Sequence, residues 1–264
     1  MVTGPQPSPF PDHFSALAGD YCRYRPQYPP DLFAYLASLA PARQHAWDCA
    51  TGNGQAALGL APWFQRVTAS DASAAQIAAA QPAPNLEYRI APAHASGLPS
   101  QSLDLISVAQ ALHWFDLDAF YAEARRVLKP TGVLAAWCYE LMSIEESIDP
   151  LIQSFYRDIL GPYWPPERAW VEQGYQGLPF PFQEIHAPAF RMTQDWNRHD
   201  CLGYLATWSA VKQYRAALHQ DPLDWLAPRL AERWPAPMER KQVGWPLALR
   251  VGRPAAPHAG AGSG

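Results

Sequence analysis

Two closely spaced glycines stand out in the segment WDCATGNGQAALGLA, which covers residues 47–61. An apolar run precedes Gly52 and Gly54 and an alanine-rich run follows them, as where a strand turns tightly into a helix. Glycine lets backbone amides approach a ligand closely and adopts dihedral angles that other residues resist. With Ala57 the spacing also matches the dinucleotide pattern GxGxxG/A, which is a weak signal alone, and no Gly-Lys-Ser/Thr follows, which excludes a P-loop.

Two acids flank this turn. Asp48 lies four residues before Gly52, and Asp71 ends the next predicted strand, 19 residues after Gly52. A carboxylate beside the turn would repel a pyrophosphate but suits a ligand that carries positive charge, such as S-adenosylmethionine with its sulfonium and ammonium groups. A carboxylate at Asp71 can accept hydrogen bonds from both hydroxyls of a ribose. The alternative for Asp48 is an acid at a strand end that caps the following loop.

Strands and helices alternate through the first half of the chain. The expected strands are 45–50, 66–71, 86–91, 103–110 and 131–139, and the expected helices are 54–64, 72–81 and 116–129. This alternation predicts βαβ units and therefore an α/β, doubly wound, Rossmann-like sheet with helices on both faces. Ligands of such sheets lie outside the carboxyl ends of the strands, where the glycine turn and Asp71 stand.

The pattern changes after Tyr139. Two helices are expected at 147–160 and 202–218, with a strand at 184–192 between them. The expected organisation is a flexible N-terminus (1–12), a cofactor-binding core with an N-terminal lid (13–139), a cap or substrate region with one sheet strand (140–240), the last core strand (241–252) and a disordered tail (253–264).

Composition limits the classes of partner. Of the 264 residues 48% are hydrophobic and 17% charged, with a net charge of −4, which is typical of a globular protein with a sizeable core. No basic block follows the chain, so we expect no nucleic-acid partner. Four scattered cysteines indicate free thiols and no metal site. The absence of a leader and of a long apolar run predicts a cytoplasmic protein without a membrane partner. The oligomeric state stays open.

Several motifs resemble those of class I S-adenosylmethionine-dependent methyltransferases. The segment WDCATGNGQ resembles their first motif, with Ala50 in place of its first glycine, SDAS resembles the second, and LDLISVAQALHWFD resembles the motif of strand four. The N-terminal pattern is similar to that of the type 11, trans-aconitate-methyltransferase-like branch; its residues here are Tyr21, Arg25, Pro26, Tyr28 and Pro29. The resemblance covers residues 13–139 most specifically. It implies a seven-stranded sheet whose last strand is antiparallel.

The resemblance also implies a site for S-adenosylmethionine, with S-adenosylhomocysteine as the product. The residues that it assigns to the cofactor are Tyr21, Arg25, Asp48, Ala50, Gly52, Gly54, Asp71, Ala72, His94, Ala95, Ala109 and Gln110. Asp48 and the two glycines would hold the methionine end, Asp71 the ribose hydroxyls, and Ala72 the adenine face.

Some of these assignments carry alternatives. His94 stands where the family often has an acid that receives the adenine amino group, so the amide of Ala95 is the second candidate for that contact. The backbone of Ala109 and Gln110 would meet the methionine ammonium. Arg25 would pair with the methionine carboxylate or with an acidic substrate, and its alternative is a structural surface ion pair.

The acceptor is expected near the end of the fourth strand. His113 is the candidate base, since its ordinary pKa of ~6.5 lets it take a proton near neutrality, and the alternative is an imidazole hydrogen-bonded within its loop. The candidate substrate-binding residues are Trp114, Tyr139, Trp164, Tyr175 and Trp208. As a group the aromatic residues between 163 and 208 favour a bulky or planar apolar acceptor, and the alternative for each is core packing. They are Tyr163, Trp164, Trp170, Tyr175, Trp196, Tyr204 and Trp208.

The sequence therefore predicts a methyltransferase that acts on a small, apolar or planar molecule by in-line transfer. Three alternatives remain at this point. The same pocket also serves enzymes of this fold that use the sulfonium for decarboxylation, oxygenation or cyclisation. A nicotinamide-dependent oxidoreductase and a non-catalytic interaction protein are the others.

Overall fold

The computed structural model describes residues 25–255, and the structural statements below refer to this part of the chain. The expectations for Tyr21 and for residues 1–12 lie outside it, as does most of the segment 253–264.

An eight-stranded sheet forms the centre of the molecule, with the order β3-β2-β1-β4-β5-β8-β6 and with β7 also paired to β8. The strands are β1 (His45–Cys49), β2 (Arg66–Asp71), β3 (Leu86–Ile90), β4 (Leu103–Ala109), β5 (Leu128–Tyr139), β6 (Gln183–Ile185), β7 (Phe190–Trp196) and β8 (Lys241–Arg253). Strands β1 to β5 pair in parallel, and β8 is antiparallel to each of its neighbours. This confirms the predicted Rossmann-like fold with an antiparallel last strand.

The sheet differs from the expectation by one strand, because the segment 184–192 contributes to two strands instead of one. Ile185 of β6 pairs with Val251 and Phe190 of β7 pairs with Leu247. The chain thus advances five residues from β6 to β7 while β8 advances only four. Pro188 lies within the gap, where it offers no backbone N–H to the ladder. The extra residue and the proline interrupt the pairing, which gives eight strands and not seven.

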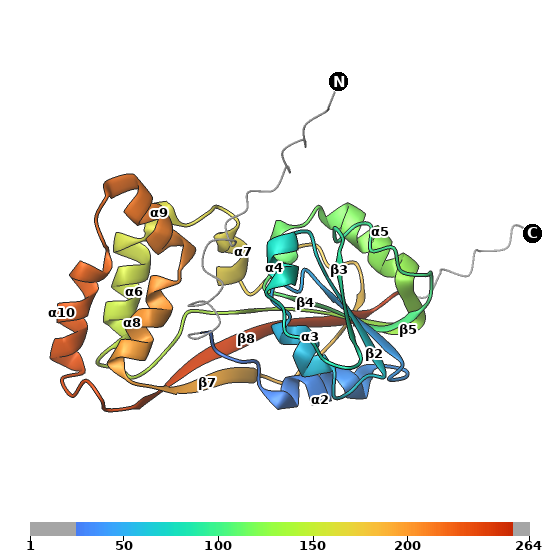
Figure 1. Cartoon of the computed structure of the whole chain (residues 1–264), viewed down its shortest axis with the longest axis horizontal. Helices are drawn as coiled ribbons and strands as arrows, with labels where there is room; N and C mark the ends of the chain where they lie inside the picture. Colours follow the sequence, from blue (N-terminus) through green and yellow to red (C-terminus); the bar gives the residue numbers. More distant parts are fainter. Residues whose placement is uncertain (1–24, 256–264) are drawn as a thin grey trace, which may run out of the picture.

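Helices cover both faces of the parallel part of the sheet (Figure 1). They are α2 (Pro30–Leu39), α3 (Gln55–Leu60), α4 (Ala74–Ala78) and α5 (Leu117–Val127). Successive side chains of β5 point to opposite faces, as the pleat requires. Trp137 packs in the same buried cluster as α2 and α3, whereas Cys138 packs in the cluster that contains Phe120 of α5.

The second half of the chain adds a helical cap beyond one end of the sheet, joined to it by β7 and β8 (Figure 1). Its helices are α6 (Asp149–Ser154), which continues as the π-helical turn η2 (Phe155–Ile159), the 3-10 turn η3 (Gly161–Tyr163), α8 (Arg198–Ala206), α9 (Ser209–Leu218) and α10 (Leu223–Arg233). The short helix α7 (Arg168–Glu172) lies between these helices and α4 of the core (Figure 1).

The helix expected at 202–218 is two helices, α8 and α9. The hydroxyl of Thr207 donates to the carbonyl of Tyr204 over 2.6 Å, and Trp208 has an extended backbone. The local bond of a threonine hydroxyl competes with the helical ladder, so the chain turns here.

Candidate active site

A cavity of about 900 Å³ lies between the carboxyl ends of the parallel strands and the cap. The segments after β1, β2, β3 and β4 line one part of it. The end of β5 and residues between Trp164 and Lys212 line the other. The cavity therefore lies where ligands bind in doubly wound sheets.

The loop after β1 has a left-handed backbone at three positions. The φ angles of Ala50, Gly52 and Gly54 are 54°, 57° and 90°. Ala50, which stands where the resemblance expects a glycine, thus adopts a conformation that costs an L residue on the order of 1 kcal/mol. Ala50 and Gly52 line the cavity. An added Cβ at Gly52 would meet only the Gln76 side-chain oxygen, at 3.8 Å, so the backbone there is open to a ligand.

Asp71 lies on the cavity wall at the tip of β2. Its two carboxylate oxygens accept hydrogen bonds from the backbone amides of Gly52 (2.9 Å) and Ser73 (2.8 Å). A carboxylate oxygen accepts more than one bond, so each oxygen keeps room for a ligand hydroxyl. This arrangement fits the expected contact with the two hydroxyls of a ribose.

Asp48 is placed differently from the expectation that it holds the cofactor. It is fully buried below the loop, where it accepts bonds from the hydroxyls of Thr51 (2.5 Å) and Ser107 (2.6 Å), and it is not part of the cavity wall. Its side chain lies beside its register partner Ser107 on β4. Burial raises the pKa of Asp48 to about 6, and the bonds from Ser107 and Thr51 oppose that rise. Asp48 is thus joined by a hydrogen bond to Thr51, which lines the cavity.

Gly54 also lies outside the cavity wall. A Cβ at this position would come within 2.1 Å of the phenol oxygen of Tyr88. The positive φ and this close approach both require glycine. Glycine at this position therefore lets the start of α3 pack closely against Tyr88 of β3.

The segment after β3 brings one of its two expected contacts to the cavity: His94 lines it, whereas Ala95 does not. Ala72, which follows β2, lines the cavity as well. The amide of Ala95, expected to meet adenine, instead donates to the carbonyl of Pro92 over 3.2 Å. Because the Ala95 amide is already bonded within this turn, His94 is the candidate for the polar contact with adenine in this segment.

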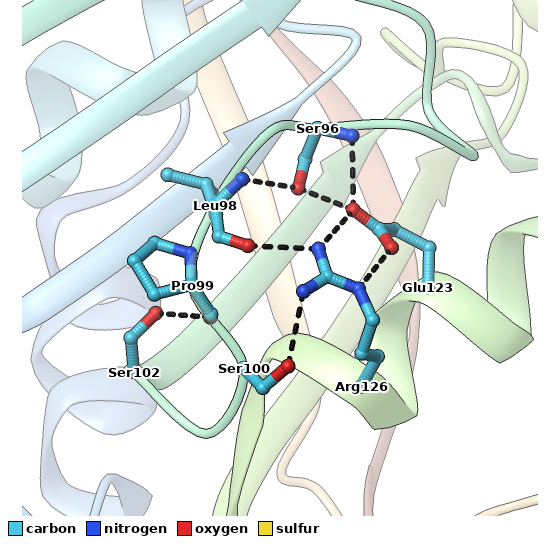
Figure 2. A network of polar contacts seen from close by, with 7 residues as sticks. All are labelled: Ser96, Leu98, Pro99, Ser100, Ser102, Glu123 and Arg126. Atoms are coloured by element: carbon cyan, nitrogen blue, oxygen red, sulfur yellow. Dashed lines mark hydrogen bonds and ion pairs between the residues drawn. The ribbon is translucent and has the colours of Figure 1, made fainter.

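A polar network fixes the chain just beyond this segment (Figure 2). The carboxylate of Glu123 on α5 accepts bonds from the amide and hydroxyl of Ser96 and from Arg126, which also donates to the carbonyl of Leu98 and the hydroxyl of Ser100. The bonds from Arg126 lower the pKa of Glu123 to about 2. The network ties the loop behind His94 to a helix.

The end of β4 brings two more expected residues to the cavity. Ala109 and Gln110 both line it. Gln110 has a φ of 58°, and its amide donates to the carbonyl of Trp137 over 2.8 Å. A left-handed glutamine directly after a strand is a strained conformation of the kind found at ligand sites.

His113 lies in the 3-10 turn η1 (Leu112–Trp114) and lines the cavity, and its Nδ1 is 2.9 Å from the phenol oxygen of Tyr175. Burial lowers the pKa of His113 to about 4, and the positive charge of Arg168 adds to the lowering. The imidazole is therefore neutral near pH 7. Tyr175 is fully buried beside His113 and is not part of the cavity wall, contrary to its expected role in substrate binding.

The other expected aromatic residues divide between cavity and core. Trp114, Tyr139, Trp164, Tyr204 and Trp208 line the cavity. Trp196 packs edge-on against Trp245 with ring centroids 5.0 Å apart, and Tyr163 packs against Tyr214. Trp170 is among the exposed large hydrophobic residues.

Further cavity residues had no individual assignment from the sequence. They include Tyr28, Thr51, Arg168 and Lys212, beside the expected Arg25. Tyr28 stands in the N-terminal motif that carried the resemblance, so that motif was the available signal for it. Arg168 and Lys212 belong to short cap helices with no motif of their own.

Comparison with known proteins decides the class of this site. The family model described as a methyltransferase domain matches residues 47–136. A Dictyostelium discoideum protein named as a methyltransferase is 34% identical over 228 residues, which is 84% of this chain and 87% of the relative. The chain belongs to the class I S-adenosylmethionine-dependent methyltransferases.

Further matches agree with this family. A Saccharomyces cerevisiae protein named as an S-adenosylmethionine-dependent methyltransferase is 26% identical and covers 54% of each chain. A solved structure named as a type II methyltransferase, from Anaeromyxobacter dehalogenans, is 47% identical with a TM-score of 0.84, over 88% of this chain and 99% of that one. The trans-aconitate-methyltransferase-like branch stays a prediction.

This methyltransferase thus takes S-adenosylmethionine as its cofactor, which decides against the dinucleotide alternative. The residues present fit that group, because Asp71 offers ribose acceptors and the glycine loop is open at Gly52. Residues 25–255 contain no group of three or more His, Cys, Asp or Glu side chains placed to bind a metal ion. None of the helices described is both long and apolar enough to span a bilayer.

Proposed function

We propose that this methyltransferase acts on a small acceptor with a planar or apolar body, bound in the cap side of the cavity. The observation that carries the proposal is that one continuous cavity has the expected cofactor residues on one side and cap aromatics on the other. Trp164 and Trp208 have ring centroids 5.5 Å apart, and Tyr204 lies 5.9 Å from Trp208. Such walls suit a flat apolar molecule better than a small polar one.

The cofactor is proposed to lie along the carboxyl ends of β1 to β4. Asp71 would accept from the ribose, Ala72 and His94 would flank the adenine, and the backbone of Ala109 and Gln110 would face the methionine end. S-adenosylmethionine supplies an activated methyl group on a sulfonium. What remains for the protein is to align the acceptor with that group and to exclude water from the space between them.

His113 is proposed to assist acceptors that lose a proton. Its Nδ1 is already beside Tyr175, so Nε2 is the ring nitrogen left for a ligand. To act as a base, Nε2 must be unprotonated, which requires Nδ1 to carry the hydrogen and donate it to the phenol oxygen. With its pKa near 4, the imidazole is in the basic form at neutral pH but is a weak base.

Activity with a panel of acceptors tests this function. The purified chain is incubated with S-adenosylmethionine and pairs of acceptors that carry the same nucleophile on an aromatic or on a short polar body. We expect S-adenosylhomocysteine and a methylated product with aromatic acceptors, and a lower kcat/KM for Trp208→Ala. Trp170→Ala is the matched control, since Trp170 does not line the cavity.

Two results would contradict the proposal. Equal or better use of the polar acceptors would remove the planar, apolar class. Conversion of an acceptor that consumes no S-adenosylmethionine, or forms no methylated product, would favour the non-methylating chemistry of the same fold.

A further inference from the structure

Arg168 places a positive charge in the cap wall of the cavity. It is the first residue of α7, it is only partly exposed, and it lines the cavity with Tyr139, Trp164 and Trp208. The guanidinium is close enough to His113 to contribute to the lowering of its pKa. Arg168 therefore lies on the side of the cavity where the acceptor is proposed to bind.

Neighbouring groups hold the Arg168 side chain in place. Its Nε donates to the phenol oxygen of Tyr156 over 2.8 Å, and that phenol donates to Glu172 over 2.6 Å. The guanidinium carbon also lies 4.9 Å from the ring centroid of Trp164. These contacts orient the planar group before any ligand arrives, which lowers the entropy lost on binding.

No carboxylate within residues 25–255 forms a direct ion pair with Arg168. The ion pairs of that part of the chain do not include Arg168. Its one hydrogen bond to the described residues uses Nε, which leaves the other four N–H donors of the guanidinium. A partly buried cation whose donors find no acceptor among the described residues is costly unless a ligand pairs with it.

A second cation lies on the same side. Lys212 of α9 lines the cavity, and burial lowers its pKa, with the charge of Arg25 adding to the lowering. The charges of Lys212 and of Arg25, which also lines the cavity, thus act on one another. A neutral acceptor would not pair with these cationic groups.

The acids of the cavity wall do not cancel this charge. Asp71 is bonded to two backbone amides at the expected ribose position, and Asp116 caps α5 by accepting from Ala119 at 3.2 Å. Glu140 lines the cavity but is exposed and forms no ion pair with Arg168.

We infer that the methyl acceptor is anionic and joins its planar body to a carboxylate that Arg168 binds, with Lys212 nearby. A guanidinium fork matches a carboxylate with two parallel hydrogen bonds, and the Trp164 and Trp208 rings would hold the flat body beside it. The inference rests on the proposed function, since it names the substrate class of the same site.

Binding measurements test this without requiring turnover. The chain is saturated with S-adenosylhomocysteine and titrated calorimetrically with cinnamate and 2-naphthoate, and then with the corresponding uncharged amides. We expect each carboxylate to bind at least about tenfold more tightly than its amide, as for one charged hydrogen-bonded pair. In Arg168→Met this preference should disappear, while the affinity for S-adenosylhomocysteine should be unchanged.

The control is Arg157→Met, which removes an exposed arginine of the neighbouring η2 turn outside the cavity wall and should keep the preference. Arg168→Lys should keep part of it. If Arg168→Met fails to fold, Lys212→Met and the comparison of acid with amide in the wild type still decide the question.

The inference is overturned if no carboxylate binds, if acid and amide bind equally, or if Arg168→Met keeps the preference. Failure of the proposed function would look different. In that case the acids would bind with the expected preference, yet no S-adenosylhomocysteine would form from S-adenosylmethionine with any acceptor.

Discussion

The backbone amide of Gly52 donates a hydrogen bond to the carboxylate of Asp71 over 2.9 Å, which joins the loop after β1 to the tip of β2. The same carboxylate receives the amide of Ser73 on its other oxygen. One acid therefore shapes two loops of the cofactor side and still has acceptor capacity for a ligand. Loss of Asp71 should change both the loops and the binding of the cofactor.

Three glycine substitutions separate backbone strain from close packing. Gly54→Ala should lower the free energy of unfolding by about 1–3 kcal/mol more than Gly97→Ala, because both positions have positive φ but only Gly54 meets Tyr88. Gly161→Ala, with open space and no positive φ, should have almost no effect. Urea unfolding measures all three, and equal losses for Gly54→Ala and Gly97→Ala would show that the contact with Tyr88 is not tight.

The network of Figure 2 should contribute to stability in a pH-dependent way. Glu123→Gln should lower the free energy of unfolding at pH 7 by about 1–3 kcal/mol, because a buried charged partner of Ser96 and Arg126 is lost. The pKa of Glu123 lies near 2, below its ordinary value, so the stabilisation is present above about pH 5 and is lost as the pH falls toward 2.

Chemical denaturation of wild type and Glu123→Gln at several pH values measures this difference. Glu87→Gln is the control, since its carboxylate is half-exposed in pairs with Arg66 and Arg89 and should contribute about 0–1 kcal/mol. A difference between wild type and Glu123→Gln that does not shrink in acid would contradict the network's role.

His113 should stay neutral throughout the physiological range. Its pKa near 4 lies below the ordinary value, so the unfolded chain binds more protons between about pH 4 and 6.5 and the protein loses stability as the pH falls through that range. His113→Gln should remove part of this fall in the free energy of unfolding. The difference in that free energy between the variant and wild type should therefore change between pH 7 and pH 5. Burial is the main cause, so Tyr175→Phe should leave the pKa low.

Nitrogen-15 NMR of labelled histidine reads both the pKa and the tautomer of His113. A midpoint near 6.5 would contradict the burial argument. A hydrogen on Nε2 in the free protein would contradict the proposed role of His113 as a base.

The sequence predicted several residues that line the cavity at the ends of the parallel strands, for a physical reason. In a parallel sheet the ligand residues directly follow the strands, so locating the strands also located Gly52, Asp71 and Gln110. Asp48 was harder, because whether a strand-end side chain points into the cavity or below the loop depends on its register with Ser107.

The cap side could be predicted only as a group of aromatic residues. Nothing local in the sequence distinguishes Trp208, which lines the cavity, from Trp196, which packs on Trp245. Arg168 gave no signal either, since its place beside Trp164 depends on how the irregular segment after η3 folds over the sheet. Tertiary packing decides these positions.

The most direct test of the account is the affinity of the chain for S-adenosylmethionine and S-adenosylhomocysteine in wild type and Asp71→Asn. We predict calorimetric binding of both by wild type and a loss of about tenfold to a hundredfold in Asp71→Asn, because the ribose and both loops lose a charged acceptor. Asp31→Asn, at an exposed acid outside the cavity wall, should bind as wild type does. Equal affinity in Asp71→Asn, or binding of NADH in place of either compound by wild type, would contradict it.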